Sequence, residues 1–263
     1  MEAYESYLTE QGLAPTTIKN HLRNLRKYKE SFSIDADEGQ TIQDMSSYPV
    51  GSKRQTIATT ISKYRTYKKY PNEQIVLFLK GSLLQTLAGN KITSDAKSDV
   101  IPTIKELKAR MDSFYDNRDY RSYVIMYLLL NLNVRNLDLD ATITTTKPTD
   151  TDRNYLFVRP ASVQYIRNHY KTFTTYGQLV HTLKTPNLIT ALKEMFLLKL
   201  KIINDPGNAT RLVKMITGGF TEADIFKRVV SETVGAKKLK QIGQNRGTAV
   251  STITESYAID QKG

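Results

Sequence analysis

Apolar residues recur at helical spacing through the first ninety residues of the chain. Ile18, Leu22 and Leu25 fall three or four positions apart with cations between them, which predicts a helix after the break at residues 12–15. The same pattern predicts a short helix over residues 2–10, a basic amphipathic helix over 53–70 and a more apolar helix over 73–88. The first part of the chain is therefore predicted to be a helical bundle.

Residues 89–100 are polar and lose this periodicity, with Gly89-Asn90 and Ser94-Asp95 as breakers. We therefore predict two domains, 1–90 and 102–263, joined by a linker over 91–101. In the second domain, helices are predicted over 104–115 and 120–131. Strands are predicted over 155–159 and 162–171, where aromatic and β-branched residues gather. The predicted fold class is mainly α with a small antiparallel β-sheet.

Composition narrows the possible functions. The net charge is +12, of which the first hundred residues contribute +3 (14 Lys and Arg against 11 Asp and Glu) and the rest +9. This charge suits a polyanion such as DNA. There is no cysteine and there are only three histidines, so disulfides and thiolate chemistry are excluded and no metal site is predicted.

The first residues and the longest apolar run indicate where in the cell the protein is expected. The first residues lack the basic start and apolar core of a secretion signal, and the longest apolar run, around 124–132, is too short to span a bilayer. We expect an intracellular, soluble protein that does not bind membranes. The sequence does not distinguish cytoplasm from nucleus.

One arginine stands out in the second domain. The run YLLLNLNVRNLDL (127–139) predicts an apolar helix that delivers Arg135 into a turn containing Asp138. A buried helix that ends in an arginine paired with an acid would show the same pattern. The run resembles the first arginine box of the tyrosine recombinases and integrases.

Two further segments extend this resemblance. In the recombinases and the related type IB topoisomerases, a hairpin lysine follows the first arginine box, and Lys171 occupies the matching place; a surface lysine in a turn is the alternative. Near the end of the chain, LKQIGQNRGT (239–248) leads to Tyr257. This resembles the final recombinase box, in which a donor on a glycine turn precedes the nucleophilic tyrosine. Arg246 stands eleven residues before Tyr257, whereas the family usually has a histidine somewhat closer, so a neighbour of Arg246 remains an alternative donor.

The second arginine box matches least well. The family pattern is His-x-x-Arg, and the corresponding region, TEADIFKRVV (221–230), places Lys227 or Arg228 at the arginine without restoring the histidine. Ile225, Phe226 and Val229 form an apolar stripe, and both cations fall off it. Either cation could bind a phosphate or simply face solvent.

The start of the chain resembles another part of the same proteins. The stretch YLTEQGLAPTTIKNHLRNLRKY (7–28) is similar to the opening of the core-binding domain in phage-type integrases. The resemblance implies a DNA-clamping first domain, with a solvated basic face as the alternative. The candidate DNA-binding residues are Lys19, Arg23, Arg26, Lys27, Lys53, Arg54, Lys63 and Arg65.

Together these matches imply a DNA recombinase or integrase, divergent and of viral or mobile-element kind, with a core-binding domain before a catalytic domain. The resemblance implies that Tyr257 forms a 3′-phosphotyrosyl link, that Lys171 protonates the leaving oxygen, and that arginines neutralise the phosphate. It implies no cofactor, double-stranded DNA as partner, and a dimer or tetramer on paired sites. Two alternatives remain: a type IB topoisomerase, and a noncatalytic DNA-binding protein that keeps the fold. The implied catalytic residues are Arg135, Lys171, Lys227 or Arg228, Arg246 and Tyr257.

Overall fold

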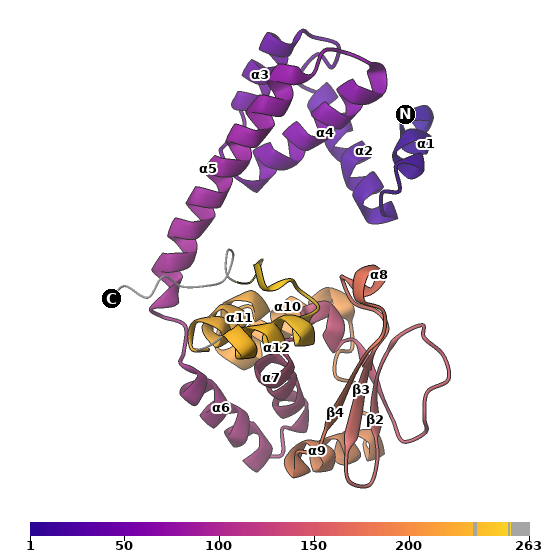
Figure 1. Ribbon diagram of the computed structural model, residues 1–263, viewed down its shortest axis with the longest axis vertical. Helices are drawn as coiled ribbons and strands as arrows, with labels where there is room; N and C mark the ends of the chain where they lie inside the picture. The colour runs from indigo at the N-terminus through magenta and orange to yellow at the C-terminus, as the bar shows by residue number, and fades with distance from the viewer. Residues whose placement is uncertain (234–235, 252, 254–263) are drawn as a thin grey trace. The chain divides into compact units, whose positions relative to one another are not determined.

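The computed structural model describes residues 1–233, 236–251 and 253. The chain divides into two compact units, residues 1–96 (unit 1) and 97–263 (unit 2), and each is described by itself (Figure 1). Unit 1 contains the helices α1 (Glu2–Glu10), α2 (Pro15–Lys29), α3 (Glu38–Ser46), α4 (Ser52–Lys68) and α5 (Glu73–Ser98), of which α5 runs past the boundary.

Each helix of unit 1 contributes to one buried core. Leu8, Leu25, Met45, Ile61 and Ile75 come from α1 to α5 in turn, and all are fully buried. The spacing that predicted the helix after residue 15 also predicts its inner face, because Leu25 lies there. Burial of this apolar surface is the main stabilising contribution to the bundle.

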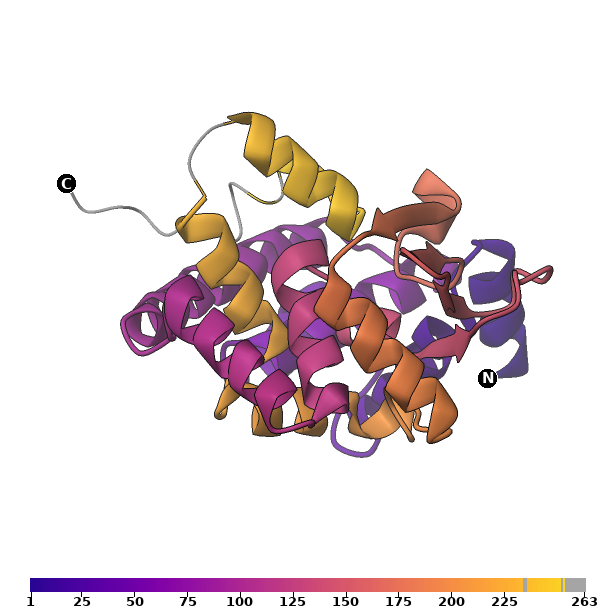
Figure 2. The ribbon, with the colours of Figure 1, turned by 90° about the horizontal axis from the view of Figure 1, so that it is seen from below.

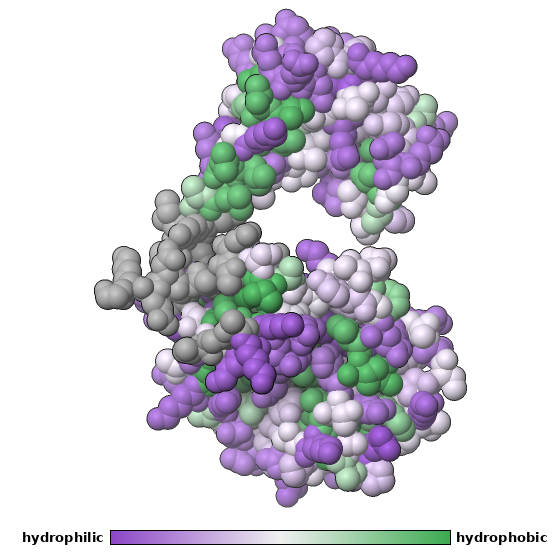
Figure 3. Space-filling model, in the orientation of Figure 1, coloured by the Kyte–Doolittle hydropathy of each residue, from purple (hydrophilic) through white to green (hydrophobic). Residues whose placement is uncertain are grey.

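Helix α5 is longer than the sequence predicted. The prediction ended it at residue 88 and placed a linker over 91–101, whereas the helix continues to Ser98. Glycine and asparagine lower helix propensity by only about 1 kcal/mol or less each, so they do not force a break. Helix α5 also exposes the leucines Leu77, Leu84 and Leu87, and Figure 3 shows hydrophobic residues along it.

Unit 2 is mainly helical, with one small sheet. Its elements are α6 (Ile104–Asp116), α7 (Tyr120–Leu132), the 3-10 helix η1 (Asn136–Leu139), β1 (Ala141–Thr144), β2 (Asn154–Val158), β3 (Val163–Arg167), α8 (Phe173–Tyr176), β4 (Leu179–Leu183), α9 (Pro186–Leu197), η2 (Pro206–Asn208), α10 (Ala209–Thr217), α11 (Glu222–Ser231) and α12 (Ala236–Arg246).

Helix α7 is the centre of unit 2. Every residue from Ser122 to Leu130 is buried, and the helix contacts α6, α9, α10, α11 and α12. Figure 2 shows α7 between α6 and α9. A helix that is apolar on all sides needs neighbours on all sides, so the run that marked Arg135 in the sequence is the core element on which the site is built.

The sheet has the order β1-β2-β3-β4. Strands β2, β3 and β4 pair antiparallel, with Leu156 opposite Tyr165 and Tyr165 opposite His181, whereas β1 pairs parallel to β2. The predicted class, mainly helical with a small sheet, is confirmed, although the sheet is mixed rather than wholly antiparallel. The loop 145–153 returns the chain to the start of β1 before β2 begins, which makes the first pairing parallel.

Candidate functional site

The segment that carries Arg135 directly follows α7. Asn133 ends that helix in the left-handed conformation (φ 54°), which asparagine tolerates better than most residues. Val134 is buried, and Arg135 then enters η1 with an extended backbone (φ −87°, ψ 163°). The Arg135 N–H donates to the Asp138 carboxylate over 2.8 Å. This local bond fixes Arg135 at the point where the chain leaves the core.

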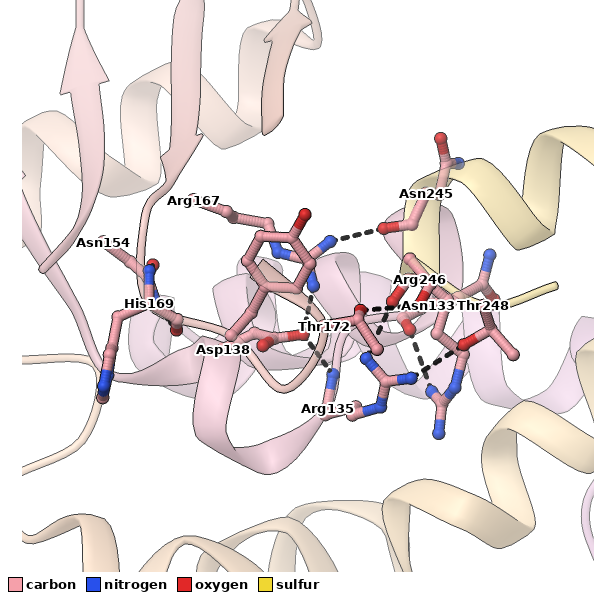
Figure 4. Close-up of polar contacts among 12 residues, drawn as sticks. Asn133, Arg135, Asp138, Asn154, Arg167, His169, Thr172, Asn245, Arg246 and Thr248 are labelled. Carbon is pink, nitrogen blue, oxygen red and sulfur yellow. Dashed lines mark hydrogen bonds and ion pairs between the residues drawn. The ribbon is translucent and has the colours of Figure 1, made fainter. Parts of the chain in front are cut away.

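The Arg135 side chain reaches a turn near the end of the described chain, residues 246–248 (the 246–248 turn). Its Nη1 donates to the carbonyl oxygen of Arg246 over 2.8 Å and its Nη2 to Oγ1 of Thr248 over 2.7 Å (Figure 4). A guanidinium has five N–H donors. Two are used here, and the other three have no partner among the described residues. Arg135 is half-buried, so part of the residue stays accessible to solvent.

The loop between β3 and β4 meets the same turn. Thr172 donates from Oγ1 to the carbonyl oxygen of Gly247 over 2.7 Å, and the neighbouring Lys171 is exposed. Gly247 has φ +65°, and a Cβ there would lie 2.8 Å from Oγ1 of Thr172 and 2.9 Å from the Tyr170 ring. Only glycine allows this close approach. The 246–248 turn therefore brings the loop of Lys171 together with Arg135.

Arg246 points inward from the turn. Its Nη1 donates to the carbonyl oxygen of Asn133 over 2.9 Å, its Nη2 forms an ion pair with Glu222, and its guanidinium lies 3.8 Å from the centre of the Phe226 ring. The side chain is only 3% exposed. Arg246 thus fastens the turn to α7 and α11, and its carbonyl oxygen accepts the hydrogen bond from Arg135.

A second buried arginine lies behind Arg135. Arg167, at the end of β3, forms an ion pair with Asp138 and donates to the carbonyl oxygen of Asn245, and both charged side chains are fully buried. The Tyr165 hydroxyl donates to the backbone carbonyl of Asp138 over 2.5 Å. These contacts tie together the Arg135 segment, the sheet and the end of α12.

Burial and the neighbouring positive charges have opposite effects on the pKa of Asp138. Burial raises the pKa of Asp138 above its ordinary value, while Arg167 and the N–H of Arg135 lower it. Burial, followed by the charge of Arg246, lowers the pKa of Arg135. An arginine starts from a pKa above 12, so Arg135 stays charged at neutral pH and can attract a phosphate.

Removing Arg167 should strongly destabilise unit 2. Arg167→Met leaves Asp138 buried without its cation, and such losses cost about 3–5 kcal/mol. We expect urea denaturation to show this decrease in the free energy of unfolding. Adding Asp138→Asn to Arg167→Met should recover part of it, because the amide oxygen still accepts from Arg135 and carries no charge. A single variant as stable as the wild type would show that the pair contributes nothing.

His181 should make stability depend on pH. Burial and the nearby charge of Arg167 lower the pKa of His181 to about 4, from 6.5 in an unfolded chain. The neutral ring therefore stabilises the fold fully above pH 6.5, and this contribution is lost as the pH falls toward 4. In urea denaturation, His181→Gln should decline less than the wild type between pH 7 and 5. Part of the decline should remain in His181→Gln, because the pKa of His21 in unit 1 is also lowered. The exposed His169→Gln is the control, and an equal decline in His181→Gln would contradict the assignment.

The remaining predicted catalytic residues are Lys227, Arg228 and Tyr257. Arg228 donates to the carbonyl oxygen of Ile101 over 2.6 Å and lies 3.8 Å from the Glu232 carboxylate, so it holds the start of unit 2. Lys227 is only 6% exposed on α11, so the expectation that it falls off the buried face of this helix is wrong. Tyr257 lies outside the described residues. Among the described residues, no hydrogen bond or ion pair is shown between Arg135 and Lys227 or Arg228, the two candidates for the second arginine box.

The predicted DNA-binding residues of unit 1 divide into two groups. Arg54 donates to the carbonyl oxygens of Ser46 and Tyr48 at the end of α3, and Arg65 is 2% exposed and donates to the carbonyl oxygens of Ala36 and Pro71. The Arg65 guanidinium is buried by these contacts, so we correct the expectation that it faces DNA, whereas Arg54 is half-buried and stays a candidate. The others are exposed or half-buried and stay candidates: Lys19, Arg23, Arg26, Lys27, Lys53 and Lys63.

The sequence did not single out several residues of the site. Arg167 ends an alternating strand and gives no local signal for burial, and Glu222 reads as a helix-start acid. Thr172 and Thr248 are two threonines among many. Their roles depend on contacts across 24 to 113 residues, which spacing within one segment does not reveal.

The described part of the chain contains neither a metal-ligand cluster nor a membrane-spanning helix. Within it, no group of three or more His, Asp or Glu side chains is placed to hold a metal ion. No helix among the described residues is long and apolar enough to cross a bilayer.

Comparisons with known proteins show a distant likeness among solved structures. No protein-family model matches the chain, and no curated protein matches it. Among solved structures, the chain is similar to one described as the crystal structure of XerA recombinase, with 10% sequence identity and a TM-score of 0.39 over 98% of this chain and 92% of that one. At this distance, the functional proposal depends on the contacts within the site.

Proposed function

We propose that the chain is a DNA strand transferase of the tyrosine-recombinase type. One observation carries the proposal: Arg135, the loop of Lys171 and Arg246, which the sequence placed in family order, meet at the 246–248 turn. Two of these contacts join residues more than 70 positions apart. Sequence order alone does not require such segments to meet, whereas a shared phosphate site does.

In this proposal the site residues have distinct tasks. The three remaining donors of Arg135 bind the nonbridging oxygens of the scissile phosphate. Lys171 protonates the leaving 5′ oxygen, for which its exposed ammonium on a loop is suited. Tyr257 attacks phosphorus to give a 3′-phosphotyrosyl link. Arg246 supports the turn rather than the phosphate, because Glu222 already neutralises it.

A nicked duplex tests the proposal. When cleavage releases a short strand that diffuses away, religation fails and the covalent protein–DNA adduct accumulates. We expect an adduct that survives denaturation with SDS. Absence of any adduct, under conditions in which the chain demonstrably binds the same duplex, would reject strand transfer.

A noncatalytic DNA-binding protein is the second candidate. It is favoured by the observation that Arg167 pairs with the buried Asp138 and Arg246 with the half-buried Glu222, so each of these guanidinium groups already has a carboxylate partner. Phosphoryl transfer normally needs several fixed positive groups. Binding to the nicked duplex without an adduct would support this candidate.

The basic face of α2 should contribute to DNA affinity through phosphates. Arg23, Arg26 and Lys27 are exposed, and replacing all three with glutamine should weaken binding to many sequences. The log–log dependence of affinity on salt should flatten by about 0.9 for each phosphate that the variant no longer binds. Fluorescence anisotropy over a salt series measures both effects.

A charge-matched control separates direct phosphate binding from net charge. Replacing the exposed Lys105, Lys108 and Lys201 of unit 2 with glutamine removes the same charge. These residues are not among the proposed DNA-binding residues, so the salt slope should stay near the wild-type value. An unchanged slope in the α2 variant would mean that its basic face is only solvated.

A further inference from the structure

Helix α8 exposes two aromatic side chains close to Lys171. Phe173 is 37% exposed and Tyr176 is 47% exposed, and the helix begins two residues after Lys171, which is itself exposed. Figure 1 shows α8 at one end of the sheet. A single exposed aromatic residue is ordinary, but two on a four-residue helix beside an exposed lysine require an explanation.

A buried tyrosine holds this helix in place. Tyr170 is 5% exposed, and its hydroxyl donates to the carbonyl oxygen of Gly177 over 2.8 Å. The Phe173 ring packs edge to face against the Tyr170 ring, with the ring centres 6.0 Å apart, and the Arg167 guanidinium lies 4.7 Å from the centre of the Tyr170 ring. The Phe173 ring is therefore positioned before any ligand binds, which lowers the entropy cost of binding.

The start of α8 is tied to the candidate phosphate site. Thr172, directly before the helix, donates to the carbonyl oxygen of Gly247, and Arg135 donates to the carbonyl oxygen of Arg246 in the same turn. The two exposed rings therefore belong to a segment that is fixed to the 246–248 turn. A DNA strand with a phosphate at Arg135 would bring its neighbouring nucleotides toward α8.

Exposed rings beside cations suit an unpaired nucleobase. Proteins that bind single strands stack bases on aromatic side chains while basic residues follow the backbone. A paired base is already stacked on both faces, so a ring on the protein surface stacks only on a base that has left the duplex. An apolar protein partner would fit the rings of Phe173 and Tyr176 but gain nothing from Lys171 and Arg135.

We propose that Phe173 and Tyr176 form a stacking platform for an unpaired base of the strand that leaves after cleavage. Lys171, which protonates the leaving 5′ oxygen in the proposed reaction, lies two residues before the platform. The first base of the departing strand is therefore the one held there. This inference rests on the proposed function for the place of the phosphate, but stacking of an unpaired base requires no cleavage.

The test uses the full chain and two duplexes of equal length and charge, one fully paired and one with a short central run of mismatches. The wild type should bind the mismatched duplex more tightly. Phe173→Leu and Tyr176→Leu keep an apolar side chain without a ring. Each should lower the affinity for the mismatched duplex by about 5- to 150-fold, the effect of losing the stacking of one base. The affinity for the paired duplex and its salt dependence should not change.

Three substitutions serve as controls. Phe196→Leu removes a ring that is 40% exposed on α9, and it should keep the wild-type preference for mismatches. Phe173→Tyr and Tyr176→Phe retain a ring and should keep the preference too. Thermal unfolding checks the fold of each variant, because Phe173 packs against Tyr170.

A crosslink locates the base directly. A 5-iodouracil placed in the mismatched run is joined by near-ultraviolet light to an aromatic ring stacked on it. We expect the crosslinked peptide to contain Phe173 or Tyr176. Crosslinks confined to peptides outside residues 168–178 would contradict the platform.

Failure of the platform and failure of strand transfer are distinguishable. A wild type without preference for mismatches, or an unchanged preference in both leucine variants, would overturn the platform and leave the rings to a different partner. If a covalent adduct still forms on the nicked duplex in that case, strand transfer stands. If the preference depends on the rings but no adduct forms, the platform stands while strand transfer fails.

Discussion

Tyr257→Phe is expected to abolish covalent adducts with a nicked duplex while DNA affinity stays nearly unchanged. The substitution removes only the hydroxyl, which is the attacking group in the proposed reaction, so no phosphotyrosyl link can form. The ring and the charge of the chain are the same in both proteins. Adduct yield on a denaturing gel and affinity by anisotropy measure the two quantities.

Two other tyrosines provide the controls. Tyr176 is 47% exposed on the loop that carries Lys171, and Tyr170 is buried and donates to the carbonyl oxygen of Gly177. Tyr176→Phe and Tyr170→Phe should both still form adducts. An adduct that persists in Tyr257→Phe would move the nucleophile elsewhere, and Tyr176 would be tested first because it is exposed.

Much of the fold could be predicted because its elements are locally consistent. The spacing of Ile18, Leu22 and Leu25 identifies both a helix and its buried face, and each of these residues is buried. The run 120–131 predicted α7 to within one residue. The strands β2 and β3 were predicted from aromatic and β-branched residues, although β3 ends at Arg167, earlier than expected.

Other elements could not be predicted from local pattern. Strand β1 is four residues long and its pairing with β2 is set by the loop 145–153, which carries no periodic signal. The continuation of α5 to Ser98 opposed the local propensity of its glycine, asparagine and serine residues. Propensity is a weak prior over such short stretches.

The candidate site could likewise be predicted only in part. The order of Arg135, Lys171 and Arg246 was visible in the sequence, and their segments do meet. The direction of each side chain was not visible. Arg246 turns inward because it forms an ion pair with Glu222 and donates to the Asn133 carbonyl oxygen. Arg65 is buried because it donates to the carbonyl oxygens of Ala36 and Pro71. Such partners lie on other elements, so spacing alone predicts the segment and not the role.

Arg135→Lys is expected to slow cleavage by about 100- to 1,000-fold, the effect of losing one fixed donor at a developing charge. Lysine keeps the positive charge but cannot reproduce the planar fork that contacts the 246–248 turn and still presents free N–H groups to a phosphate. The affinity for DNA should change little, because the charge is retained. Single-turnover cleavage of the nicked duplex gives the rate.

Arg121→Lys is the control for structural damage. Arg121 lies at the other end of α7 and donates from Nε to the Ile202 carbonyl oxygen over 2.8 Å, so its replacement also removes an internal hydrogen bond. The most direct test of the Arg135 phosphate site is therefore the ratio of single-turnover cleavage rates in the two variants. We expect Arg121→Lys to cleave at close to the wild-type rate and Arg135→Lys to be slower by about 100-fold or more at similar stability, because only the latter removes a donor at the phosphate. Near-normal cleavage in Arg135→Lys would return Arg135 to a purely structural role and contradict the proposed site.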